Sequence, residues 1–140
     1  MRLEAEALER FAKESKKKVV NDLVIWTRED NESIAVSPDG VIGKTEAVEV
    51  KCLSSARHIE AYLTQQIPDE YQYQVFQYFI VNKSLKTLHF VFYYPRLLAK
   101  DFFVIEVKRK DGEEEIKRLL EIEKATLVEV DEIVNKLSKF

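Results

Sequence analysis

The run from Ala47 to Leu53 constrains the fold most strongly, because it is apolar except for two charged residues, Glu49 and Lys51. A short apolar run of this kind is typical of a strand in the middle of a sheet. Side chains alternate along a strand, so Glu49 and Lys51 share one face while Val48 and Val50 share the other. A charge in a central strand is costly unless it has a partner. We therefore expect further polar groups to meet this pair.

A second carboxylate precedes this strand, in the sequence Ser37-Pro38-Asp39-Gly40. The glycines that follow Asp39 predict a turn between two strands, which brings Asp39 beside Glu49. Each motif also has an ordinary structural explanation when it is taken singly. An Asp between Pro and Gly is common in turns, and Glu-x-Lys is common on a strand face that is exposed to solvent. Together, two carboxylates and the ammonium of Lys51 converge on one spot, and hard oxygen ligands such as these carboxylates suit Mg²⁺ or Mn²⁺. Metal-assisted phosphodiester hydrolysis is the chemistry that such a cluster favours.

A third carboxylate comes from a predicted helix over residues 2–17. Ala7, Leu8 and Phe11 form a narrow apolar stripe on this helix, and Glu4 falls at the centre of the stripe. The alternative is a first-turn glutamate that the helix dipole favours. An acid on the core face of a helix usually has a partner there, so we expect Glu4 to point inward toward the other two acids.

The composition is that of a compact domain, which we expect to span residues 1–140. The chain is 46% hydrophobic, and 22 basic against 25 acidic residues give a net charge of −3, so any DNA contact has to be local. The single cysteine, Cys52, is too few for an iron–sulfur cluster. We find no long apolar stretch and no secretory leader, which predicts a cytoplasmic protein, in a cell or an infected host, that does not enter a membrane.

The pattern of elements predicts an α/β (α+β) fold. Beyond the first helix, we expect strands at 19–27, 33–37 and the Glu49 run, a helix at 69–82, strands at 87–94 and 102–107, and one or two helices from 112 to 140. This order predicts a central mixed five-stranded sheet flanked by helices.

The motifs resemble a known family. A helix with Glu4, then Ser-Pro-Asp-Gly, then Glu-x-Lys-Cys, is similar to the PD-(D/E)XK nuclease superfamily, and specifically to its lambda exonuclease or YqaJ-type viral recombinase branch. Tyr71-x-x-Gln74-Val75, Tyr94-Pro95-Arg96 and the strand at 102–107 follow that branch in order. The resemblance runs from Glu4 to about Val107. It implies a restriction-endonuclease-like nuclease core.

The resemblance also implies a role for each motif residue. Asp39 and Glu49 would ligate Mg²⁺ or Mn²⁺, Glu4 would ligate or orient a second ion or its water, and the carbonyl of Val50 would be a further ligand. Lys51 would position the attacking water or stabilise the charge that develops on the phosphate.

Residues near this centre are expected to complete the site. The resemblance places Gln74 at its edge, holding Lys51 or the water, with Tyr71 one helical turn earlier on the same face. Arg57 follows the Glu49 strand closely in the sequence, and we expect it to contact a DNA phosphate.

The leading hypothesis is a Mg²⁺-dependent DNA exonuclease that prepares ends for recombination or repair. Two alternatives stay open: a structure-selective endonuclease like a Holliday-junction resolvase, and a decayed nuclease that binds DNA or a partner. DNA is the expected partner, with a recombination or annealing protein as another. Ring-shaped trimers occur in that branch, so the resemblance leaves a homo-oligomer open, and nothing in the sequence establishes one. Members of the branch usually carry a segment before the first helix that anchors the 5′-phosphorylated end, so we expect that end-binding pocket to be missing from residues 1–140.

Overall fold

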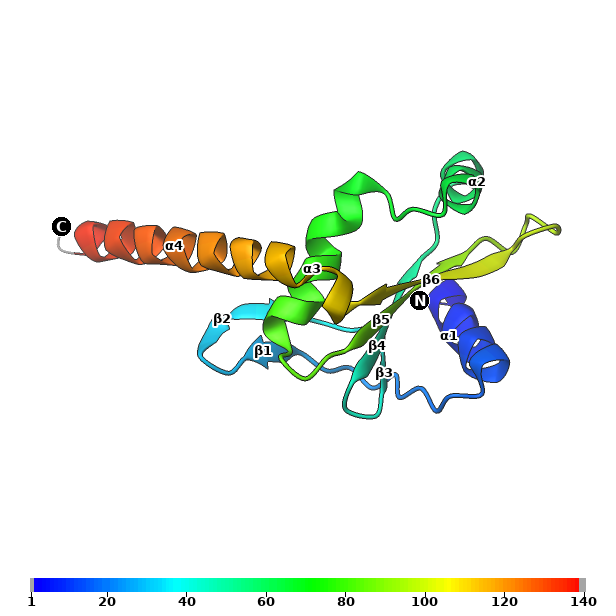
Figure 1. The fold of residues 1–140 in the computed structure, drawn as a ribbon, viewed down its shortest axis with the longest axis horizontal. Helices are drawn as coiled ribbons and strands as arrows, with labels where there is room; N and C mark the ends of the chain where they lie inside the picture. Colours follow the sequence, from blue (N-terminus) through cyan, green and yellow to red (C-terminus); the bar gives the residue numbers. More distant parts are fainter. Residues whose placement is uncertain (1, 139–140) are drawn as a thin grey trace.

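The computed structural model describes residues 2–138, which form a mixed sheet with helices packed around it (Figure 1). In chain order, the elements are α1 (Arg2–Ser15), β1 (Trp26–Arg28), β2 (Asn31–Val36), β3 (Gly40–Ile42), β4 (Glu46–Lys51), α2 (Ser55–Thr64), a 3₁₀ turn (Asp69–Tyr71), α3 (Gln72–Val81), β5 (Thr87–Tyr93), β6 (Phe102–Lys108), a second 3₁₀ turn (Arg109–Asp111) and α4 (Glu113–Leu137). The predicted class is confirmed.

The main sheet has four strands in the order β3-β4-β5-β6, and β1 and β2 form a separate two-stranded sheet. Strands β4 and β5 are parallel, while the other neighbours in the main sheet are antiparallel. The strand count therefore differs from the five expected. Of the strand predicted at 19–27, only residues 26–28 form a regular strand, and Val20 makes one isolated bridge to Val41.

Two apolar clusters cover the two faces of the sheet. On one face, Val48 and Val50 of β4 pack with Ala7, Leu8 and Phe11 of α1. These three α1 residues are the predicted stripe, and they are buried. On the other face, Ala47 of β4 and the aromatic side chains of β5 pack against α3 in the larger cluster. The alternation expected for the Glu49 strand is confirmed, and β4 is central to both clusters.

Two arginines fix the carboxyl end of α3. Arg109 donates hydrogen bonds to the carbonyls of Phe79 (2.7 Å), Asn82 (2.6 Å) and Leu85 (2.6 Å). Arg28 is 7% exposed and donates to the carbonyl of Ile80 at 2.5 Å. The last carbonyls of a helix have no partner within the helix, and positive charge is favourable at that end. The two guanidinium groups therefore hold α3 at a fixed position over the sheet.

Helix α4 begins against the body of the protein and then runs away from it (Figure 1). Within α4, Ile116 is buried, whereas the helix from Ile122 onward exposes several large apolar side chains, namely Ile122, Val128, Val130, Ile133, Val134 and Leu137. None of the helices within residues 2–138 combines the length and the apolar character that crossing a membrane requires.

Candidate metal centre

Asp39 is tied directly to the end of β4. It follows the buried Pro38 in the link between β2 and β3, and its backbone N–H donates to the carbonyl of Val48 at 3.2 Å. Its side-chain oxygen Oδ2 accepts a hydrogen bond from the backbone N–H of Val50 at 2.7 Å. These two bonds place the Asp39 carboxyl group beside β4. The predicted approach of Asp39 to the Glu49 strand is therefore seen in the structure.

Glu49 lies on the face of β4 that is covered by α3 and is 5% exposed. Its oxygen Oε1 accepts a hydrogen bond from the hydroxyl of Tyr78 at 2.5 Å, and its oxygen Oε2 lies 3.6 Å from Lys51 Nζ. Burial and the nearby Glu49 charge raise the pKa of Tyr78, so the phenol keeps its proton and acts as a donor. Glu49 is thus held by one neutral donor and one ammonium group.

Glu4 reaches the same place from the first turn of α1. Its carboxyl group is hydrogen-bonded to that of Asp39, and this contact together with burial raises the pKa of Glu4 to about 7. Burial and the neighbouring Glu49 charge likewise raise the pKa of Asp39, which also has a side-chain contact with Glu49. Asp39 therefore joins Glu4 to Glu49, and the three predicted acids are neighbours.

The donor set fits a hard divalent ion. Carboxyl groups that crowd together keep protons at higher pH than usual, and a divalent cation relieves this repulsion by replacing the proton. A pocket of about 280 Å³ opens beside Glu4 and Asp39, which leaves space for the water ligands that Mg²⁺ retains. Within residues 2–138, no three His, Cys, Asp or Glu side chains already stand in a complete metal-binding arrangement. A bound ion would therefore require the carboxylates to move from their present positions.

Tyr71 and Arg57 extend the site along its polar edge. The ammonium of Lys51 lies over the ring of Tyr71, 4.5 Å from its centre, and the guanidinium of Arg57 is 5.9 Å from the same ring. Arg57 is also paired with Glu70. Cations at these positions are attracted by the negative face of the ring. The structure thus brings Lys51, Tyr71 and Arg57 together.

Gln74 shares a face of α3 with Tyr78, four residues later, and comes three residues after Tyr71, the last residue of the preceding 3₁₀ turn. It is half-buried. Among the residues described, Lys51 contacts Glu49 and Tyr71 and forms no hydrogen bond with the Gln74 side chain. A role for Gln74 in holding the lysine stays a prediction.

Tyr78 is a site residue that the sequence motifs do not single out. It is fully buried, and its hydroxyl donates a hydrogen bond to Glu49. The usable signal is its spacing, since Tyr78 comes four residues after Gln74 and so shares its helix face.

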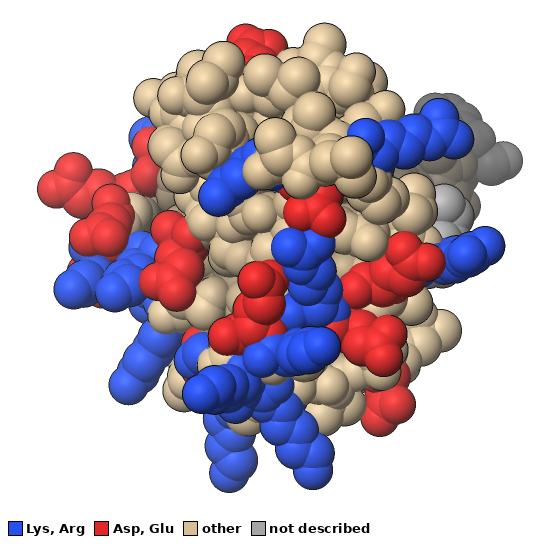
Figure 2. Space-filling model, turned by 90° about the vertical axis from the view of Figure 1, so that its right-hand side faces the viewer, with Lys and Arg blue, Asp and Glu red and all other residues tan. Residues whose placement is uncertain are grey.

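The surface charge around the fold is mixed. Figure 2 shows acidic and basic side chains interspersed over the lower half of one face, while the upper part is largely uncharged. On that face the basic side chains gather from the centre downward, with acidic side chains on both sides of them.

Known proteins resemble both the sequence and the fold. The model of the YqaJ-like viral recombinase domain matches residues 1–84. The crystal structure of an alkaline exonuclease, LHK-Exo from Laribacter hongkongensis, has a TM-score of 0.81 and 26% sequence identity, over 99% of this chain and 72% of that one. The same enzyme in complex with dAMP has a TM-score of 0.80 at 26% identity, over 99% of this chain and 71% of that one. No curated protein sequence matches the chain.

Proposed function

The chain belongs to the YqaJ-like viral recombinase domain family, and from this premise we propose that it is a Mg²⁺- or Mn²⁺-dependent deoxyribonuclease that removes nucleotides from DNA ends. The observation that carries the proposal is the contact series Glu4–Asp39–Glu49, with Lys51 beside Glu49. The structural similarity of this chain to an alkaline exonuclease supports exonuclease activity over other nuclease activities.

Glu4, Asp39, Glu49 and the carbonyl of Val50 would hold the ion. An ion held there would supply Lewis-acid chemistry, polarising the phosphate and lowering the pKa of a bound water toward neutral. Glu49 is the best-fixed ligand, because Tyr78 and Lys51 hold its two oxygens. Ligands held by outer hydrogen bonds keep their orientation, which improves both metal affinity and activity.

Lys51 supplies the positive charge next to the reacting phosphate. Its ammonium is fixed between Glu49 and the ring of Tyr71, and a cation fixed in this way stabilises the charge of the transition state without having to reorganise. Gln74, on the face of α3 that it shares with Tyr78, would orient the attacking water. Arg57 would bind a phosphate next to the one that reacts, exchanging its contact with Glu70 for the DNA.

The proposal is tested by incubating the protein with end-labelled linear duplex DNA, closed circular DNA and a four-way junction, each with Mg²⁺ or with EDTA. We expect mononucleotides from the linear duplex with Mg²⁺ only. The Lys51→Ala variant should lose about 100-fold or more in rate. The Lys110→Ala variant, which changes an exposed lysine outside the site, is the matched control.

Each other outcome has a definite meaning. Cleavage of the junction without digestion of ends would replace this proposal with a structure-selective endonuclease. No cleavage of any DNA, in a protein that binds Mn²⁺ no better than its Asp39→Asn variant, would show a decayed nuclease. Equal rates for Lys51→Ala and the parent would refute the site assignment.

A further inference from the structure

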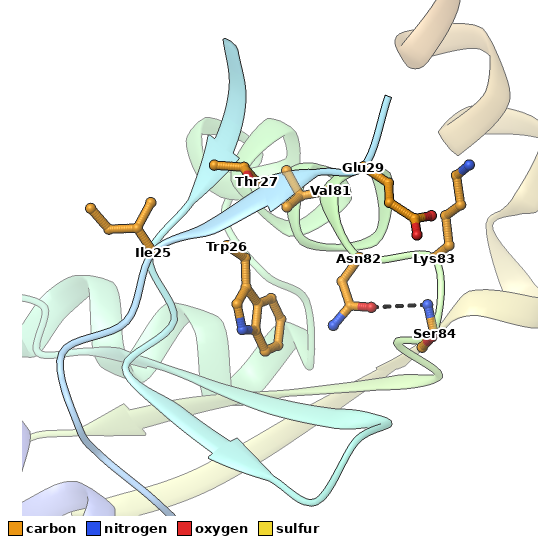
Figure 3. Close-up of a pocket in the computed structure, with 8 residues that line it drawn as sticks. All are labelled: Ile25, Trp26, Thr27, Glu29, Val81, Asn82, Lys83 and Ser84. Carbon is orange, nitrogen blue, oxygen red and sulfur yellow. Dashed lines mark hydrogen bonds between the residues drawn. The ribbon is translucent and has the colours of Figure 1, made fainter. Parts of the chain in front are cut away.

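A second pocket, of about 340 Å³, lies where β1 meets the loop that follows α3. The side chain of Trp26 forms one wall (Figure 3). The indole is held by an edge-to-face contact with Tyr78, at 6.4 Å between ring centres and an angle of 86°. Tyr78 is the residue that donates to Glu49. The pocket is therefore built on the same aromatic side chain that supports the candidate metal centre.

Asn82 gives this pocket a fixed polar group. Its oxygen Oδ1 accepts a hydrogen bond from the backbone N–H of Ser84 at 2.9 Å. Because the oxygen is used in this way, the amide nitrogen is turned toward the ring of Trp26, as Figure 3 shows. An aromatic face beside a carboxamide donor is suited to a nucleobase, which can stack on the ring and accept a hydrogen bond at its edge.

An exposed apolar segment joins this pocket to the candidate metal centre. Residues 21–25 form no helix or strand, and within them Leu23 is 94% exposed and Ile25 is 68% exposed. Leu23 lines the pocket that also contains Glu4 and Asp39, whereas Ile25 lines the Trp26 pocket. These two side chains present apolar surface between the two pockets, which the bases of a bound strand would cover.

The separation of the two pockets matches a short piece of DNA strand. Trp26 is paired with Val36, and Asp39 follows Val36 by three residues. Because three residues of chain span at most about 3.5 Å each, the Cα atoms of Val36 and Asp39 lie no more than roughly 10 Å apart. The two pockets are therefore close enough for a few nucleotides of one strand to reach both.

We propose that the Trp26 pocket binds a base of an unpaired DNA strand whose backbone passes the metal centre, with Leu23 and Ile25 covering the bases between. This inference rests on the proposed function and names the form of its substrate at this site, which is a single strand. A free nucleotide would occupy the pocket without needing the apolar segment, and the experiment separates the two.

Trp26 is the only tryptophan in the chain, so its fluorescence reports this pocket directly. The protein is titrated in EDTA, where the DNA is not cut, with a short thymidine oligonucleotide, an abasic strand of the same length, and dTMP. We expect saturable quenching of the emission by the oligonucleotide, and little by the abasic strand or by dTMP at the same nucleotide concentration. Unchanged emission on oligonucleotide binding, or equal quenching by dTMP, would overturn the proposal.

Variants provide a second measurement that does not depend on the fluorescence of Trp26. The affinity for a labelled oligonucleotide, followed by anisotropy, should fall about 5- to 150-fold in Trp26→Leu, the range for loss of one stacked base. Leu23→Ser should lower it by less. The control is Leu98→Ser, at a side chain that is 93% exposed between β5 and β6. An equal affinity of Trp26→Leu and the Leu98 control would also overturn the proposal.

The two proposals can fail separately. Quenching by the oligonucleotide in a protein that cuts no DNA would preserve the base-binding pocket and remove the nuclease. Digestion of DNA ends without quenching would preserve the nuclease and remove the pocket.

Discussion

Strand β4 carries two glutamates, Glu46 near its start and Glu49 near its end, and their surroundings are opposite. Glu46 is bonded to Lys17 Nζ at 2.9 Å and to His89 Nε2 at 2.7 Å. Although burial opposes it, these contacts lower the pKa of Glu46. Glu49 instead meets the hydroxyl of Tyr78 and the carboxyl of Asp39, with Lys51 at 3.6 Å.

This difference separates a structural carboxylate from a candidate ligand. The protein itself supplies the partners of Glu46, one of which is the ammonium of Lys17, so that cluster is complete without an added ion. Around Glu49, further acids are gathered instead, and their mutual repulsion favours a divalent cation. The residue type and the strand are the same, so the neighbours decide the role. Four predictions test this contrast.

The largest effect is expected from Glu49→Gln. Loss of a metal ligand should reduce the rate of nucleotide release from linear duplex DNA by more than about 100-fold, beyond the 10- to 100-fold typical of outer-shell partners. Glu46→Gln should digest the same DNA at a rate close to the parent, because Glu46 has no contact with the acid cluster. Equal losses in the two variants would remove the distinction.

Tyr78→Phe should lower Mn²⁺ affinity and the rate of digestion by about 10- to 100-fold, because Glu49 loses the hydroxyl that orients it. Tyr73→Phe is the matched control. Tyr73 lies on the same helix, and its hydroxyl donates to Glu123, away from the site, at 2.7 Å. Metal titration and initial rates measure both variants. An unaffected Tyr78→Phe would mean that the bond to Glu49 is only structural.

Glu46→Gln should instead reduce the free energy of unfolding, by about 1–3 kcal/mol, because the buried His89 and the ammonium of Lys17 lose their ionised partner. Urea unfolding in EDTA measures this. Glu49→Gln, which removes one acid from a repelling cluster, should cost less under the same conditions. The opposite order would show that Glu49 is the structural carboxylate of the two.

The smallest effect concerns pH in the absence of metal. The pKa of Glu4 is raised to about 7, so Glu4 contributes stability below its unfolded pKa of about 4.5 and loses that contribution as pH rises through 7. The pKa of Glu46 is lowered, so its contribution to stability is present above its unfolded pKa and is lost as the pH falls through its lower folded pKa. The difference in unfolding free energy between Glu4→Gln and the parent should therefore shift in favour of the variant from pH 5 to pH 8. We expect a shift below about 1 kcal/mol, since Glu4 is partly solvated. A shift of the opposite sign would contradict the raised pKa of Glu4 and its contact with Asp39.

Local periodicity explains what the sequence could predict. The alternation along residues 47–53 correctly put Glu49 and Lys51 on one face, and the helical stripe correctly turned Glu4 inward. Both patterns depend on neighbours within a few residues. The turn after Asp39 is also a local feature. It brings the Asp39 carboxylate to β4, where it accepts a hydrogen bond from the backbone N–H of Val50.

The parts that were not predicted depend on contacts distant in the sequence. The apolar residues at 19–25 look like a strand, but β2, the partner of β1, ends at Val36 opposite Trp26, so the strand pairing stops before it reaches them. The hydroxyl of Tyr78 finds its acceptor 29 residues earlier in the chain. No periodic pattern records such pairs, because each requires the folded arrangement of two elements.

The match to the family model ends at residue 84, but the structure does not divide there. Strand β5, which follows, is the inner neighbour of β4, and its Phe90 and Phe92 are completely buried. Arg109, further along the chain, donates hydrogen bonds to the carbonyls of Phe79 and Asn82 at the end of α3. A fragment stopped at residue 84 would have an open sheet edge beside Glu49 and a loosened helix above it. A fragment that keeps this fold around Glu49 therefore has to extend beyond the residues that the family model matches.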